Sequence, residues 1–210
     1  ATESTSFWSA KPWGDAIGTH DPSGIASSAT QADRDERAAA GAVAYQTLNP
    51  GVLGNDAQNL LAAAALIGSG SYLDVVSTTN TSDSGGSSFG DFGTWPDTAS
   101  APALKALTDA VRYDAALDAS GSVDYLPTSD DTKYTAIART SPDLKSKAVA
   151  VYNYQSSSQT LTVHVDQAGI ADGATADLLN GGAGPTISSG TFSVTLPAYE
   201  YAFFGVQEST

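Results

Sequence analysis

The sequence predicts an α/β, helix-rich region over residues 1–117, followed by an all-β, antiparallel β-sandwich over residues 118–210. Two observations support this division. Before residue 117, runs of helix formers alternate with loops rich in Gly and Ser, whereas after it apolar residues recur at every second position. A period of two is typical of strands that bury one face. Successive strands without a helix between them indicate antiparallel pairing.

Three helices and one strand are expected in the first region. Residues 31–48 are rich in helix formers, carry acidic residues near their start and meet a stop signal at Asn49-Pro50-Gly51. Residues 55–68 predict a second helix, and SYLDVVS at 71–77 predicts a short buried strand. A third helix is expected over 100–117, where apolar residues recur at steps of three and four: Leu104, Leu107, Val111 and Ala115.

The second region reads as a series of strands separated by turns. In QTLTVHVD, Leu161, Val163 and Val165 share one face, which places His164 on the opposite face, toward solvent. The expected strands are residues 133–139, 147–154, 159–166, 174–180, 191–196 and 199–206.

The charge of the chain limits its partners. Nine basic residues stand against 23 acidic ones, giving a net charge of −14 and a pI near 4.1. Such a surface repels phosphate backbones and anionic lipids, so we expect neither nucleic acid nor a membrane as a partner. Neutral ligands such as sugars remain compatible with it.

The chain has no cysteine, which excludes disulfides, thiolate metal sites and cysteine nucleophiles. It also lacks methionine, even at its start, and it is rich in Ser, Thr, Gly and Asp. We therefore expect a processed, secreted polypeptide. Asn80-Thr81-Ser82 is a glycosylation sequon.

The segment from about 55 to 206 resembles the end of a glycoside hydrolase of the α-amylase superfamily. NDAQNLLAAAALIGSGSYLDVVS resembles the seventh helix and eighth strand of its (β/α)8 barrel, and APALKALTDAVRYDAAL resembles the eighth helix. DDTKYTAIARTS, KAVAVYNYQSSSQTLTVHV and SVTLPAYEYAFFGV resemble strands of the C-terminal β-sandwich. The same order occurs in other barrel glycosidases, including α-galactosidase-like enzymes.

This resemblance implies a partial (β/α)8 barrel in the first region and a carbohydrate substrate. In the superfamily the catalytic acid and nucleophile come from the fourth and fifth strands, which would precede residue 1. Both are therefore expected outside this chain, and a second polypeptide that carries the rest of the barrel is an expected partner. The implied function is the C-terminal part of a secreted, retaining glycoside hydrolase that acts on an α-glucan or a related oligosaccharide.

Ala16-Ile17-Gly18-Thr19-His20-Asp21 resembles the end of the seventh barrel strand. In the superfamily that carboxylate stabilises positive charge on the sugar ring and the histidine holds a sugar hydroxyl, so the resemblance implies catalytic roles for Asp21 and His20. Thr19 replaces the family's asparagine, and the apolar run before it is short. The alternative is a β-turn over residues 21–24, in which the aspartate bonds its own backbone.

Aromatic residues suggest where a sugar would bind. Phe89, Phe92 and Trp95 lie in the loop after the expected strand at 71–77, and Trp13 lies near the start of the chain. Loops that follow barrel strands form the active site, so these rings are candidate substrate-binding residues. The alternative is that they cover the top of a core.

A different class of function also fits the sequence. A helical region joined to a β-sandwich can form a lectin-like protein that binds carbohydrate without hydrolysing it. No cofactor is expected, since no histidine pair has the spacing of a metal site. Asp130-Asp131 offers oxygens that suit calcium, but an exposed turn explains the pair better.

Overall fold

A computed structural model describes residues 45–48, 56–70, 72–75, 99–118, 120–130 and 133–206. Its first described part is a parallel β–α–β unit. Strand β1 (Tyr45–Leu48) pairs in parallel with β2 (Tyr72–Val75), and helix α4 (Asp56–Gly68) connects them. Helix α5 (Ala101–Tyr113) follows, and Pro102 in its first turn suits a helix start because its missing N–H needs no partner there.

The rest of the described chain forms two antiparallel sheets. The short helix η2 (Ala115–Leu117) leads into a five-stranded sheet with the order β3-β4-β5-β9-β7, and the second sheet pairs β6 with β8. The bounds of the strands are β3 Ser122–Leu126, β4 Tyr134–Thr140, β5 Lys147–Asn153, β6 Gln159–His164, β7 Thr175–Asp177, β8 Thr191–Leu196 and β9 Tyr201–Val206, with a short helix η3 at Asp166–Ala168.

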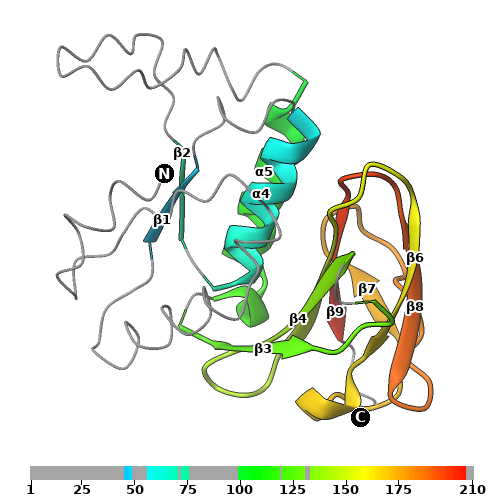
Figure 1. Cartoon of the computed structure of the whole chain (residues 1–210). Helices are drawn as coiled ribbons and strands as arrows, with labels where there is room; N and C mark the ends of the chain where they lie inside the picture. The colour runs from blue at the N-terminus through cyan, green and yellow to red at the C-terminus, as the bar shows by residue number, and fades with distance from the viewer. Residues whose placement is uncertain are drawn as a thin grey trace, which may run out of the picture.

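The elements stack in four layers (Figure 1). Helices α4 and α5 lie between the parallel pair β1–β2 and the five-stranded sheet, and the β6–β8 pair covers the far face of that sheet. Both faces of the five-stranded sheet are therefore covered. This explains why β5, with the sequence KAVAVYN, is apolar almost throughout and buried at six of its seven residues.

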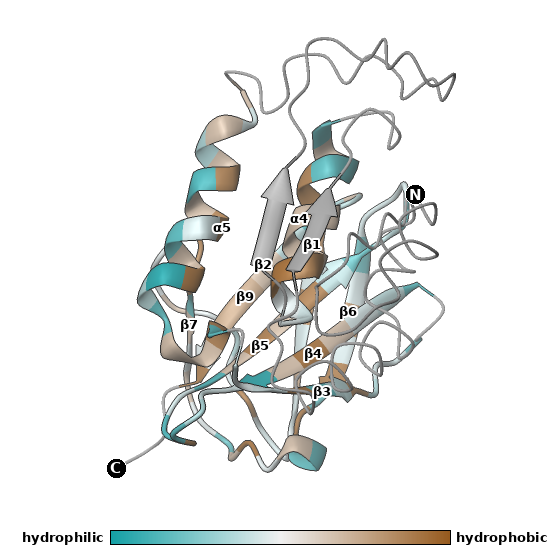
Figure 2. Ribbon diagram, turned by 90° about the vertical axis from the view of Figure 1, so that its left-hand side faces the viewer, coloured by the Kyte–Doolittle hydropathy of each residue, from teal (hydrophilic) through white to brown (hydrophobic). Residues whose placement is uncertain are grey.

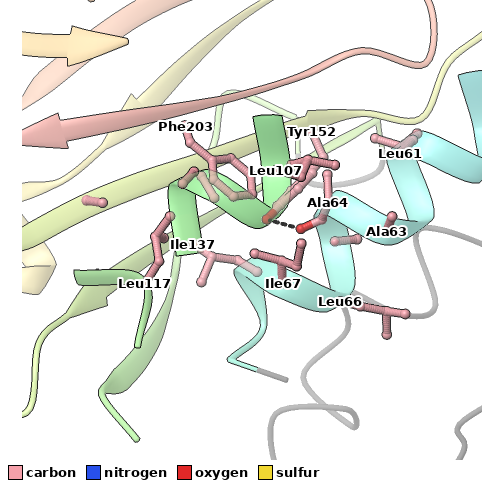
Figure 3. Close-up of a cluster of buried hydrophobic side chains, with 14 of the residues drawn as sticks. Leu61, Ala63, Ala64, Leu66, Ile67, Leu107, Leu117, Ile137, Tyr152 and Phe203 are labelled. Atoms are coloured by element: carbon pink, nitrogen blue, oxygen red, sulfur yellow. Dashed lines mark hydrogen bonds between the residues drawn. The ribbon is translucent and has the colours of Figure 1, made fainter. Parts of the chain in front are cut away.

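Two apolar clusters result from this arrangement. On the helix side, Ile137, Tyr152 and Phe203 pack against α4 and α5 (Figure 3). On the other side, alternate residues of β4, β5 and β9 meet Leu161 of β6 and Phe192 of β8. Helix α5 is amphipathic, with teal and brown residues alternating around it in Figure 2, and its Leu107 is fully buried. The two regions of the chain thus share one core.

Several expectations are confirmed. The second helix, the strand after it and all six expected strands of the second region are present, and the residues of β8 match the expectation fully. His164 is exposed on β6, as its place in the alternation predicts. The boundary at 117/118 and a closed barrel remain predictions.

Other expectations are wrong. Tyr45–Leu48 is a strand instead of the end of a helix over 31–48, because parallel pairing with β2 outweighs the helix-forming composition. The third helix ends at Tyr113, where Asp114 adopts an extended conformation and its carboxylate accepts a hydrogen bond from the N–H of Ala116. Strand β3 was not expected.

Candidate functional site

The residues proposed from the sequence for catalysis and substrate binding lie outside the described residues. This applies to His20 and Asp21, and equally to Trp13, Phe89, Phe92 and Trp95. Their roles stay predictions. The resemblance assigned residues 16–21 to the barrel strand before the one at 71–77. In the described sheet, the strand that pairs with β2 is β1, Tyr45–Leu48.

The described residues present a different candidate site, a groove between α5 and two turns of the five-stranded sheet. It consists of two adjoining hollows of about 220 Å³ and 340 Å³, which share Ala106 and Leu179 in their linings. We call them together the α5 groove. The first is lined by Ala57, Leu60, Ala103, Ala106, Leu179, Asn180, Tyr199, Glu200 and Tyr201, and the second by Ala106, Asp109, Ala110, Tyr113, Asp114, Leu178 and Leu179.

The turn after β7 forms one wall of the groove. The carboxylate of Asp177 accepts hydrogen bonds from the N–H groups of Leu179 and Asn180, each at 2.9 Å. The N–H of Leu178 donates to the carbonyl of Phe203 at 2.8 Å. The wall is therefore held by the sheet itself.

The turn before β9 lies beside the turn after β7 and continues this wall, because β7 and β9 are antiparallel neighbours, and buried Asn153 holds it. The Asn153 amide donates to the carbonyls of Pro197 at 2.6 Å and Leu196 at 3.2 Å. Its backbone N–H donates to the carbonyl of Glu200 at 2.9 Å. Tyr199 adopts a positive φ of 55°, an uncommon conformation for a residue with a side chain.

The titratable side chains of the groove are three carboxylates and three tyrosines: Asp109, Asp114, Glu200, Tyr113, Tyr199 and Tyr201. Asp109 forms an ion pair with Lys105, whereas Glu200 has no ion pair within the described part of the chain. Burial raises the pKa of Tyr201, and the Glu200 carboxylate raises it further. The Tyr201 hydroxyl therefore stays protonated near neutral pH and can donate a hydrogen bond.

The groove was not foreseen from the sequence. Its walls come from α5 and from turns about 70 to 90 residues further along the chain, and no local pattern connects them. The strongest local signal was the density of tyrosine and acidic residues in AYEY at 198–201.

The described ranges contain no group of three or more His, Cys, Asp or Glu side chains that could hold a metal ion. Asp130 instead forms an ion pair with Lys133 at 2.7 Å. Over the same ranges, none of the helices combines the length and apolar character needed to span a bilayer.

Comparison with known proteins identifies a similar fold among solved structures but does not assign the chain to a family. No family model matches the chain, and no curated protein matches it. Among solved structures, it is similar to a maltogenic α-amylase of Thermotoga neapolitana, with 10% identity and a TM-score of 0.56, over 80% of this chain and 42% of that one. An α-amylase of Geobacillus thermoleovorans, solved with acarbose, matches with 14% identity and a TM-score of 0.54 over 74% of this chain and 34% of that one.

A candidate α-galactosidase of Bacteroides fragilis is similar too, with 16% identity and a TM-score of 0.54 over 78% of this chain and 34% of that one. The chain thus spans less than half the length of the structures it matches. For the α-amylases, the match falls on the C-terminal part of the longer chain. The fold of this chain is that of the C-terminal part of α-amylase-like glycoside hydrolases.

Proposed function

We propose that this chain is the C-terminal part of a carbohydrate-active enzyme, a glycoside hydrolase that acts on an α-glucan or a related oligosaccharide. One observation carries the proposal. The β1–α4–β2–α5 order leads into two antiparallel sheets, the five-stranded one of which shares a core with the helices, and solved glycoside hydrolases have a similar fold. Since fold alone does not establish function, the chemistry needs its own test.

The catalytic acid and nucleophile belong, in this proposal, to residues outside the chain. Glycoside hydrolysis needs two carboxylates that flank the scissile bond. In a (β/α)8 barrel these come from the C-terminal ends of several strands, and the chain contributes only β1 and β2 as described parallel strands. A second polypeptide or a longer precursor would carry the others.

The role proposed for this chain is to close the barrel and to line the substrate cleft. Phe89, Phe92 and Trp95 follow β2 in the sequence, where a loop of an active site would lie. Trp13 and the pair His20-Asp21 are proposed to contribute to the same cleft, with Asp21 stabilising positive charge on the sugar ring. Secretion of the protein is part of this proposal and rests on composition.

An assay on the native species tests the proposal. Protein that contains this sequence, isolated from its source, is incubated with malto-oligosaccharides and separately with α-galactosides, and the products are followed by proton NMR. The proposal expects hydrolysis of one class with retention of the anomeric configuration. Binding of sugar without hydrolysis by any species that contains the chain would instead establish the lectin-like alternative.

A further inference from the structure

We propose that the α5 groove is a second carbohydrate-binding site, which holds two neighbouring units of a neutral sugar chain. It is built entirely from described residues of α4, α5 and the five-stranded sheet, and it does not include the residues proposed for the reaction. The choice of malto-oligosaccharide as the first probe rests on the proposed function. The class of ligand is argued from the lining itself.

The shape of the groove suits an extended ligand. Its two hollows, of about 220 Å³ and 340 Å³, meet at Ala106 and Leu179, so one ligand can occupy both. Each falls near the lower end of the range for small-molecule sites, about 300–1,000 Å³. Four alanines of the two helices line the hollows, and their small side chains leave room there: Ala57, Ala103, Ala106 and Ala110.

Tyrosine rings line both hollows. Tyr199 and Tyr201 line the first, and Tyr113 lines the second with 75% of its surface exposed. At this exposure the Tyr113 ring is accessible to a ligand. A tyrosine offers an apolar ring face and a polar hydroxyl together. This combination matches a pyranose, which has an apolar face of C–H groups and a rim of hydroxyls.

The polar groups favour a neutral ligand with many hydroxyls. None of the described residues that line the two hollows is Lys, Arg or His, so the lining itself offers no cationic side chain to a phosphate or a carboxylate. The Arg112 guanidinium lies beside the groove, 5.5 Å from the centre of the Tyr113 ring. Of the three carboxylates, Asp109 is paired with Lys105, whereas Asp114 and Glu200 form no ion pair with another described residue, so a cationic ligand is the competitor that the test includes. Hydroxyl groups can use the remaining acceptor positions of these carboxylates.

The groove is also held in place before any ligand binds. Asp177 fixes the turn after β7 and Asn153 the turn before β9, through hydrogen bonds of 2.6 to 3.2 Å. Tyr199 keeps its positive φ of 55° in the turn before β9, and its N–H donates to the carbonyl of Gln155 at 3.1 Å. Strained backbone of this kind is concentrated at ligand sites.

Two pairs of variants of the full chain test the site. Ala106→Gln fills the point that the hollows share, and Ala101→Gln places the same side chain on the exposed first turn of α5, outside both hollows. Tyr113→Ala removes an exposed ring, whereas Tyr113→Phe keeps it. Binding of maltotetraose is measured by calorimetry, with melting temperatures recorded to show that every variant is folded.

The proposal expects binding to weaken by about tenfold or more in Ala106→Gln and Tyr113→Ala, which corresponds to about 1.4 kcal/mol. Ala101→Gln should bind as the parent chain does, and Tyr113→Phe, which keeps the ring and loses only the hydroxyl, should lose less affinity than Tyr113→Ala. If an α-galactoside binds in place of maltotetraose with the same pattern, the site stands with a different sugar. Unchanged binding in all four variants, no sugar binding at all, or displacement of the sugar by spermidine would overturn the site. Hydrolysis by the native species tests the proposed function separately, so the two can fail independently.

Discussion

Gly68, the last residue of α4, lies directly against the side chain of Tyr152 on β5. A Cβ atom at position 68 would overlap the Tyr152 hydroxyl and would come within 2.9 Å of its Cζ atom and 3.3 Å of the Ala150 side chain. The same hydroxyl donates a hydrogen bond to the carbonyl of Ala64 at 3.2 Å (Figure 3). Helix and sheet are thus fitted to each other at a position where only glycine has room.

Gly68→Ala should therefore destabilise the chain strongly. Overpacking in a rigid core typically costs about 1–3 kcal/mol, and the overlap here falls on a fully buried ring. Urea unfolding of the full chain measures the loss. The control is Gly181→Ala, where a Cβ meets open space and only the φ of 75° opposes it, at about 1–2 kcal/mol.

The contact itself can be isolated by adding Tyr152→Phe. Alone, this change removes one hydrogen bond to the Ala64 carbonyl and should cost about 0.5–1.5 kcal/mol. Combined with Gly68→Ala it removes the atom that overlaps, so the double variant should be more stable than the sum of the single effects predicts. Additive effects would show that Gly68 and Tyr152 do not meet as described.

Arg139 should be a second strong determinant of stability. Its guanidinium is fully buried on β4 and donates to the carbonyl of Ile67 at the end of α4, at 2.9 Å, and to that of Asp118, at 2.7 Å. Arg139→Met leaves these acceptors without their donor and should cost about 3 kcal/mol or more in urea unfolding. Arg139→Lys should recover only part of this, because one ammonium cannot reach both acceptors.

The matched control for Arg139 is Arg112→Met. Arg112 is exposed on α5 and lies 5.5 Å from the centre of the Tyr113 ring. Its replacement should change the free energy of unfolding by about 0.5 kcal/mol or less. A loss at Arg112 as large as the loss at Arg139 would contradict the role given to the buried guanidinium.

Stability should fall in acid partly because of Asp172. Hydrogen bonds from the N–H groups of Gly190 and Ser189 lower the pKa of its carboxyl below the ordinary value. The folded chain therefore binds this proton more weakly than the unfolded chain does. The resulting stabilisation is complete above a pH of about 3.9 and is lost as the pH falls through the folded-state pKa.

Asp172→Asn should accordingly lower the urea midpoint at pH 7 and lower it less at pH 3. Asp124→Asn, on the exposed side of β3, controls for the removal of one negative charge. If the urea midpoints of Asp172→Asn and the parent chain differ more at pH 3 than at pH 7, this would contradict the hydrogen bonds from the Ser189–Gly190 turn to the Asp172 carboxylate.

Asp21→Asn tests the catalytic role inferred from the resemblance, using the native, complete enzyme. A carboxylate that stabilises charge in the transition state is worth about 100-fold or more in kcat. KM should change much less. The β-turn alternative predicts activity within about twofold of the parent, since Asn also favours turns.

Most of the sheet elements could be predicted from the sequence because their signals are local. TFSVTL alternates along an exposed sheet, and KAVAVYN is apolar throughout because the sheet is covered on both faces. Strand β3 was missed because its five residues include Asp124 and sit among turn residues. Strand β1 was hidden in a run of helix formers, and only its pairing with β2 decides its conformation.

The candidate groove could not be predicted in this way. Ala106, Leu179 and Tyr199 come together only when α5 packs beside the sheet, and that packing depends on contacts such as Gly68–Tyr152. The positive φ of Tyr199 also depends on tertiary hydrogen bonds, because tyrosine does not favour this conformation locally.

The central claim is that this chain is the C-terminal part of a larger glycoside hydrolase. The mass of the native species that contains the sequence tests this claim most directly. Native mass spectrometry of material isolated from its source should find the sequence within a longer chain, or tightly bound to a second one, with a total length of several hundred residues. The matched structures support this expectation, because the chain spans only 34–42% of them. A homogeneous species of 21.3 kDa that binds sugar and hydrolyses none would contradict it.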